Sequence, residues 1–475
     1  MSSRIWEWLK KEIKPLRKRA TPSPFARKIG RVFQIVTLLG LCTVVVWRVY
    51  LYLDINSRFS QIRAAGFPAS GAELNLWRHA VPEADNGALV LTQAFALRWT
   101  FHDGRSNEVM RIKVLGRTND WSPAMWELVE AYVQSNSLAV AKVQEALQLS
   151  QFRFPVDFSY GPDIELPHLG NLKELARMAA FQTALDVHGG SREEWPKHVE
   201  VQLELAGTLD DEPILISHLV RNAIVRMAVQ ATERSLNRVT PNDDACKRLQ
   251  SAFAHVGETN LLPAALVGER AMMIPAFRLS WKEIQSSSQR DEPASQSRTP
   301  HRYSGKPATF LWFTGFFERD LDFFLATMEK CISLARMPFP ERLDLTNYFE
   351  TACTTAQKRA YFLSEMLLPS LSRVVVRDAS NQALVELATC ALAVERFRLA
   401  EGRLPTSLKE LTPRFLDAVP IDPFDGNPVR YRRLSSGYVI YSVDSDGHDD
   451  GGLEPPERKK ATDKDSYDIT FIVER

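Results

Sequence analysis

The chain lacks the short motifs that mark common hydrolases and nucleotide-binding enzymes. Its 475 residues contain no HExxH, GxSxG or GxxxxGK[ST] pattern, so no metal-bound water, nucleophilic serine or phosphate loop is indicated. None of its five cysteines forms a pair at metal-ligand spacing, which argues against zinc. A formal net charge of +1 gives no reason to expect nucleic acid as a partner. These absences leave the middle of the chain without an assigned reaction and favour a role that is not enzymatic.

A long apolar run near the N-terminus predicts a transmembrane helix. Residues 32–53 (VFQIVTLLGLCTVVVWRVYLYL) contain one charged side chain, Arg48, and as a helix would span roughly 33 Å. The preceding basic tail, residues 1–31, has ten Lys or Arg against two acids, which places the N-terminus in the cytoplasm and allows contact with anionic lipids. We predict a single-pass protein of a bacterial inner membrane with the bulk of the chain periplasmic. A cleaved signal peptide is the alternative.

Helical periodicity dominates residues 54–375 and predicts a large α-helical ectodomain. WSPAMWELVEAYVQSNSLAVAKVQEALQL predicts one helix that is capped by Ser122. TPNDDACKRLQSAFAHV predicts another helix, with Thr240 as its cap. Residues 285–307 are rich in Ser, Gln and Pro, so we expect a disordered linker or surface loop there.

An aromatic segment follows that linker. ATFLWFTGFFERDLDFFLATMEKCISLARM is interrupted by Glu318, Arg319 and Asp320 before twenty apolar residues accumulate, so a second membrane span is not expected. We predict a helix that is buried in the core or packs on a partner. A broad exposed apolar patch between Phe310 and Phe324 would favour a protein partner.

The C-terminal hundred residues predict a compact α+β module, residues 376–475, in a protein that is otherwise mainly α. NQALVELATCALAVERFRLAEG predicts a helix that ends at Gly402, where a left-handed cap is natural. Turn-rich stretches then separate three predicted strands of a short antiparallel sheet, at residues 429–433, 438–443 and 467–473.

The order of motifs in this module resembles the globular domain of type II secretion major pseudopilins, which belong to the type IV pilin-like superfamily. The motifs are FRLAEGRLPTSLKEL, then PIDPFDGNPVRY, then YSVDSDG with GG and YDI behind it, and they cover about a fifth of the chain. In that family the hydrophobic helix directly precedes the head, whereas here it lies more than three hundred residues upstream. Ile35 also stands where the family has a glutamate after its glycine cleavage site. We therefore expect no pilin-like processing or polymerisation.

The stretch YSVDSDGHDDGG places four aspartates and three glycines behind a predicted strand. Calcium takes six to eight oxygen ligands, which carboxylates and inward-turned carbonyls can supply. The alternative is a solvated acidic turn, and the insertion at residues 453–466 adds four basic residues that could neutralise it without a metal. The resemblance implies a calcium site, whose candidate ligands are Val443 (carbonyl), Asp446, Asp449, Asp450 and Asp468.

These patterns together predict a membrane-anchored binding or scaffold protein of an envelope or secretion assembly, with a protein partner that the sequence does not identify. The alternative is a membrane-anchored hydrolase whose site lies in the helical region. A pocket with converging titratable side chains of perturbed pKa would favour that alternative.

Overall fold

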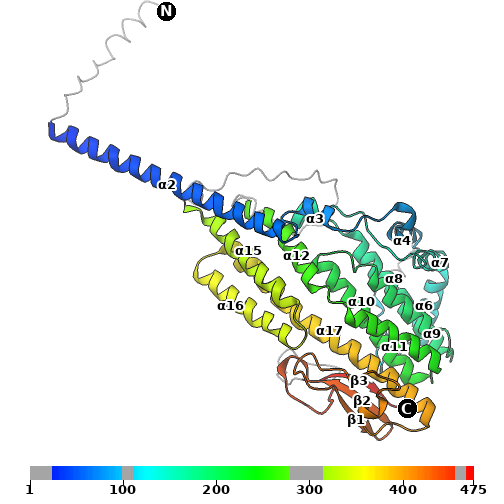
Figure 1. Ribbon diagram of the computed structural model, residues 1–475. Helices are drawn as coiled ribbons and strands as arrows, with labels where there is room; N and C mark the ends of the chain where they lie inside the picture. The colour runs from blue at the N-terminus through cyan, green and yellow to red at the C-terminus, as the bar shows by residue number, and fades with distance from the viewer. Residues whose placement is uncertain (1–23, 99–107, 110, 279–313, 455–466) are drawn as a thin grey trace, which may run out of the picture.

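The computed structural model describes residues 24–98, 108–109, 111–278, 314–454 and 467–475, and these are mainly helical with one small antiparallel sheet (Figure 1). Most of the predicted basic tail, the whole predicted linker and most of the insertion after residue 453 lie outside the described residues. The mainly α class, with a short C-terminal sheet and one apolar N-terminal helix, is therefore confirmed.

Helix α2, Pro24–Ala64, projects from one end of the folded body (Figure 1). Within the described part of the chain it is the one helix long and apolar enough to cross a membrane. It continues 11 residues beyond the predicted span, because its last turns pack on helix α15, Phe316–Ala335. Phe59 and Ile62 are each 7% exposed at this contact. The part of α2 that continues beyond the predicted span thus belongs to the core of the folded body.

The contact between α2 and α15 begins inside the predicted span. Gly315 adopts a left-handed conformation (φ 68°), and a Cβ atom there would lie 2.0 Å from the Leu51 side chain. Only glycine allows so close an approach together with that backbone conformation. Arg48, the one charged residue of the predicted span, forms an ion pair with Glu318 at 2.5 Å. Helix α2 is consequently fixed to the body rather than joined to it by a loop.

The remaining helices form the body between α2 and the C-terminus (Figure 1). They are α3 (Gly71–Trp77), α4 (Gly87–Leu97), α6 (Pro123–Ser135), α7 (Ser137–Ala146), α8 (Pro167–His188), α9 (Trp195–Gly207), α10 (Leu215–Arg238), α11 (Asp243–Glu258), α12 (Leu262–Met273), α16 (Asp344–Lys358) and α17 (Phe362–Glu401). Short 3-10 turns lie at Glu83–Asp85, Phe158–Asp163, Ile274–Arg278, Glu341–Leu343, Leu408–Leu411 and Asp444–Asp446.

Two details of the predicted helices are wrong. The stretch expected to form one helix after Ser122 is divided at Asn136, whose buried side chain donates to the Tyr132 carbonyl at 2.8 Å and interrupts the helix. The Ser122 cap itself is confirmed, since its hydroxyl accepts from the Met125 N–H.

The second error concerns the start of α11. Its cap is Asn242, which accepts from the Ala245 N–H at 2.7 Å. The predicted cap, Thr240, instead accepts a hydrogen bond from Arg475 at 2.9 Å. The sequence pattern correctly indicated that a helix starts here. Its cap was misassigned because the Thr240 hydroxyl is engaged in a tertiary hydrogen bond with Arg475.

The aromatic segment forms the buried helix α15. Phe317 and Phe324 are 7% and 0% exposed, so the described part of this segment forms no broad apolar surface patch. Phe310 lies outside the described residues. Cys331 in the same helix is a buried free thiol. A core position for the helix is confirmed.

Helix α17 is continuous over 40 residues and connects α15 and α16 with the C-terminal sheet. It ends at Gly402 (φ 68°), as predicted. One hydrophobic cluster includes Leu203 of α9, Leu392 of α17 and Phe471 of the sheet. The predicted boundary between residues 375 and 376 falls inside this helix. The division into domains stays a prediction, because one helix can serve two folding units.

The sheet consists of β1 (Arg430–Leu434), β2 (Gly437–Ser442) and β3 (Ile469–Val473), antiparallel and in the order β1-β2-β3. The three predicted strands are confirmed, with ends that differ by at most two residues. Side chains of α10 cover the outer edge of β3. Glu233 accepts from the Ile472 N–H at 2.8 Å, and the Asn237 amide donates to the Ile472 carbonyl at 2.7 Å. The edge strand is thereby protected and the sheet is fixed to the helical body.

Candidate calcium-binding loop

The acidic loop begins where β2 ends, and its shape depends on left-handed residues. Asp444 has φ 56°, Gly447 φ 68° and Gly452 φ 76°. A Cβ atom at Gly452 would lie 2.9 Å from the Tyr441 ring, so glycine is needed there for space as well as for conformation. The glycines of the motif thus fold the loop back onto the sheet.

Several aspartates of the loop stabilise its turns. Asp446 accepts from the His448 N–H at 3.0 Å. Asp449 accepts from the Gly451 N–H at 2.9 Å in the same two-residue arrangement. The Asp450 carboxylate contacts the His448 ring at 3.1 Å. Such bonds from aspartate to the backbone two residues on are a common reason for aspartate in turns.

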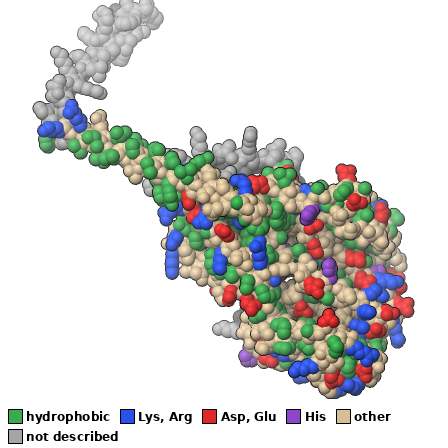
Figure 2. Space-filling model, in the orientation of Figure 1, with side chains coloured by type: hydrophobic (Ala, Val, Ile, Leu, Met, Phe, Trp, Pro, Cys, Tyr) green, Lys and Arg blue, Asp and Glu red, His purple; other side chains and the backbone are tan. Residues whose placement is uncertain are grey.

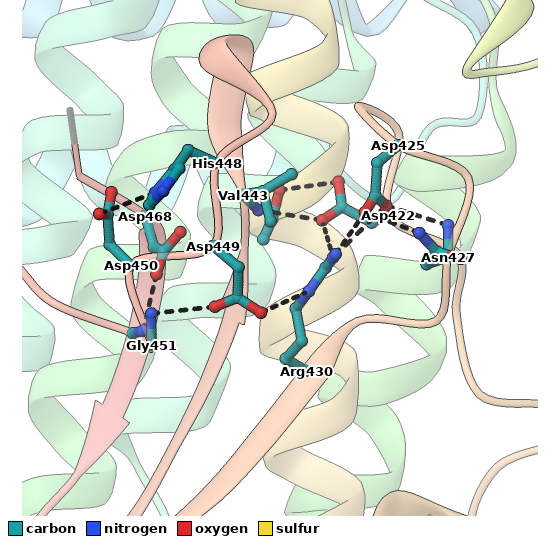
Figure 3. Close-up of polar contacts among 12 residues, drawn as sticks. Asp422, Asp425, Asn427, Arg430, Val443, His448, Asp449, Asp450, Gly451 and Asp468 are labelled. Carbon is teal, nitrogen blue, oxygen red and sulfur yellow. Dashed lines mark hydrogen bonds and ion pairs between the residues drawn. The ribbon is translucent and has the colours of Figure 1, made fainter.

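Asp468 has a different environment, as Figure 3 shows beside Asp449 and Asp450. It is 3% exposed, and its Oδ2 accepts from the Gly452 N–H at 2.6 Å. Burial raises the pKa of Asp468 above its ordinary value, and the charges of Asp449 and Asp450 act in the same direction. Asp468 Oδ1 and Asp450 Oδ2 are both buried without a hydrogen-bond partner. Two carboxylate oxygens of the predicted ligand set are thus shielded from water and unsatisfied.

A second acidic centre lies next to the loop, and the sequence analysis did not single it out. Asp422 is fully buried and accepts from the Ser442 hydroxyl at 2.9 Å and the Val443 N–H at 3.0 Å. Its Oδ2 also accepts from Arg430 at 2.7 Å. Arg430 reaches Asp449 at 3.6 Å as well, so it joins the two centres (Figure 3). The available signal was a pair of aspartates just before a Gly-Asn-Pro turn, with an arginine closely behind that turn.

The structure brings some of the predicted ligands together. Asp468 lies within electrostatic reach of Asp449 and Asp450, whereas Asp446 acts on Asp444. Across the described residues, no three or more His, Cys, Asp or Glu side chains are grouped so that they could hold a metal ion. Calcium would thus need backbone carbonyls, such as that of Val443, and water among its ligands. The calcium site stays a prediction.

Two buried polar clusters among the described residues contain histidine and a carboxylate, but neither has the arrangement of a catalytic triad. Glu212 lies between His168, at 2.9 Å, and the Ser217 hydroxyl, at 2.5 Å. A triad needs the histidine between serine and carboxylate, since the histidine takes the serine proton. His218 likewise contacts Asp378 at 2.9 Å inside the interface of α10 with α17. We interpret both clusters as structural.

A cleft of about 510 Å³ lies between α9, α11 and the segment that follows α7, and it contains a further group of titratable side chains. Glu200, Glu204, Asp210 and His255 line it. Partial burial raises the pKa of Glu204, and the charge of Glu200 adds to the effect. An acid with a raised pKa in a cleft is the feature that would favour an enzyme.

No protein-family model, curated protein or solved structure matches the chain. The resemblance to pseudopilins therefore rests on the motifs quoted above.

Proposed function

We propose that the chain is a single-pass protein of a bacterial inner membrane whose periplasmic body is a binding or scaffold component of an envelope or secretion assembly. The observation that carries the proposal is the projecting part of α2. Most of its exposed side chains are apolar, with Val32, Leu38 and Val45 each at least 60% exposed, and Figure 2 shows Lys and Arg at its outer end. Water would disfavour such a surface, whereas a bilayer would cover it.

The attachment of α2 supports a scaffold role. The Trp47 indole donates to the Thr314 carbonyl at 3.1 Å, and Arg58 pairs with Asp322 at 2.6 Å. The C-terminal sheet lies at the opposite end of the body from the projecting helix (Figure 1). Since α2 and α17 are continuous helices, the body would hold that sheet at a fixed distance from the membrane.

Calcium binding by the acidic loop is the second part of the proposal. The buried, unpaired oxygens of Asp450 and Asp468 support it, because a bound cation would satisfy both. Arg430 neutralises Asp422 and Asp425, but its nearest contact with the loop itself is the 3.6 Å one to Asp449. We expect the ion to stabilise the module and to keep its surface loop in one conformation.

Cysteine labelling tests the topology. A cysteine in place of Ser436, which is exposed in the turn between β1 and β2, should react with a membrane-impermeant maleimide once the outer membrane is permeabilised. A cysteine in place of Ser3 should stay unlabelled until the inner membrane is broken. The unmodified chain measures background from its own thiols. Labelling of the Ser3 site alone in intact inner membranes would overturn the proposed orientation.

A membrane-anchored hydrolase is the second candidate, and the raised pKa of Glu204 in its cleft favours it. A protonated Glu204 could act as the general acid, with Glu200 as the base one helical turn away. A panel of chromogenic ester, phosphoester and glycoside substrates tests this idea. Hydrolysis that disappears in Glu204→Gln but persists in Glu145→Gln, an exposed control on α7, would establish the enzyme.

A further inference from the structure

A cleft of about 200 Å³ lies where the last turns of α2 meet α12 and α15. Its charged side chains are three arginines and one glutamate, namely Arg58, Arg270, Arg336 and Glu329. Arg58 is already neutralised by Asp322, at 2.6 Å. The remaining charge of the cleft is therefore positive.

Arg270 of α12 is the unusual member of this group. It is 2% exposed, and its Nε and Nη2 atoms are buried without a hydrogen-bond partner. Burial lowers its pKa to about 10, although Glu329 acts in the opposite direction, so the guanidinium remains charged at neutral pH. A buried charge normally has a counter-ion and satisfied donors, because removing it from water is costly. None of the described side chains forms an ion pair with Arg270.

Arg336, the residue directly after α15, contacts the same aromatic ring as Arg270. The two guanidinium carbons lie 5.3 Å and 5.8 Å from the centre of the Phe67 ring. The ring attracts each cation, but two like charges at one ring repel each other. Arg270 is deeply buried whereas Arg336 is exposed at the cleft. The cleft thus offers two guanidinium groups as donors for an anion, that of Arg270 in its buried part and that of Arg336 at its opening.

We propose that this cleft binds an oxyanion of the phosphate class between Arg270 and Arg336. Guanidinium groups match the oxygens of phosphate in pairs, and such charge-assisted hydrogen bonds are among the strongest in proteins. Gln61 and Ser333 also line the cleft and can donate further bonds. Since α2 forms one wall, the bound anion would join the membrane helix to α12 and α15.

The phosphate could be dissolved or could belong to a lipid headgroup. Arg58 follows the end of the predicted span by five residues, or roughly 8 Å along the helix, so a headgroup is within reach. The lipid source rests on the proposed membrane anchoring, whereas binding of dissolved phosphate does not. The two sources can be separated by experiment.

The test is thermal unfolding of the full chain, first in nonionic detergent with increasing inorganic phosphate against chloride at matched ionic strength. We expect a saturable rise of several degrees in the midpoint for the unmodified protein. Arg270→Met should abolish the saturable rise. Arg336→Gln, at an exposed position that does not put folding at risk, should shift it to higher phosphate concentration. Arg248→Gln, an exposed arginine outside the cleft, should respond like the unmodified protein.

The lipid arm repeats the measurement in nanodiscs of phosphatidylcholine or phosphatidylglycerol without free phosphate. A rise that needs phosphatidylglycerol and Arg270, with no response to free phosphate, would assign the site to a headgroup. General stabilisation by phosphate as a salt does not saturate and is the same in every variant. The proposal is overturned if neither source gives a saturable rise, or if Arg270→Met and Arg336→Gln both respond as the unmodified protein does.

Discussion

Asp422 next to the acidic loop and Arg270 in the α2 cleft are buried to the same degree, at 0% and 2% exposure, but differ in their partners. Asp422 accepts hydrogen bonds from two backbone N–H groups, a hydroxyl and Arg430. Arg270 has no such partner among the described residues. Burial alone therefore does not distinguish a charged group that stabilises the fold from a charged group that binds a ligand. The partners do, because a compensated charge stabilises the fold whereas an uncompensated one lowers its stability until a ligand arrives.

The largest effect is expected from Asp422→Ala. The change leaves Arg430 without its most buried partner, and two backbone N–H groups and one hydroxyl without their acceptor, which should lower the free energy of unfolding by about 3 to 5 kcal/mol. Urea denaturation measures the loss. Asp425→Ala is the control, because Asp425 contacts the same arginine but its side chain is 21% exposed. Equal losses of unfolding free energy in the two variants would contradict the prediction, because they would show that burial does not make the contacts of Asp422 more stabilising than those of Asp425.

In its number of hydrogen-bond partners, Glu233 on α10 is intermediate between Asp422 and Arg270, since its carboxylate accepts from one donor, the Ile472 N–H. Burial raises its pKa from 4.5 to about 7. The folded protein thus holds a proton there that the unfolded chain releases, and this stabilisation is complete below pH 4.5 and disappears as the pH rises through 7. Glu233→Gln should remove the dependence and be more stable than the unmodified protein at pH 8, by about 1 to 3 kcal/mol.

Denaturation at pH 5 and pH 8 checks this prediction. The stability difference between the variant and the unmodified protein should grow with pH. Asn237→Asp adds a carboxylate at the neighbouring contact with β3, and because a like charge raises the pKa of Glu233 further, it should make the loss of stability with rising pH larger. A difference that is the same at both pH values would contradict the raised pKa of Glu233.

The smallest effect is expected from Arg270→Met in buffer without phosphate. Because the arginine has no ion pair to lose and a methionine can still pack on the Phe67 ring, the replacement should change the free energy of unfolding by no more than about 1 kcal/mol. Urea denaturation beside Asp422→Ala gives the comparison directly. A loss as large as that of Asp422→Ala would mean that Arg270 is compensated within the fold after all.

The features that the sequence predicted well depend on local patterns. An uninterrupted apolar run specified α2, alternation and turn residues specified the three strands, and Gly402 ended α17 because its backbone is left-handed. The break at Asn136 and the cap at Asn242 were missed, because each depends on which of several polar side chains makes the competing contact.

In the candidate sites, too, the sequence predicted what depends on local residues and missed what depends on tertiary contacts. The glycines and aspartates of the acidic loop were visible in the sequence, since they determine its local backbone. The Asp422 centre needs Ser442 and Val443, which lie at the end of β2 about twenty residues later in the chain. Arg270 appears in the sequence as an ordinary helical arginine. Its lack of a partner emerges only when α2, α12 and α15 come together.

The most direct test of the proposed calcium-stabilised module is calorimetric titration of calcium into the full chain in nonionic detergent, with Asp468→Asn and Asp444→Asn variants. Asparagine keeps the shape of each side chain, and it also tolerates the left-handed backbone of Asp444, which is not a predicted ligand. We predict saturable binding near one equivalent in the unmodified protein and in Asp444→Asn, and none in Asp468→Asn. Absence of heat and of any calcium-dependent rise in the unfolding midpoint of the unmodified protein would contradict the site and reduce the loop to an acidic turn.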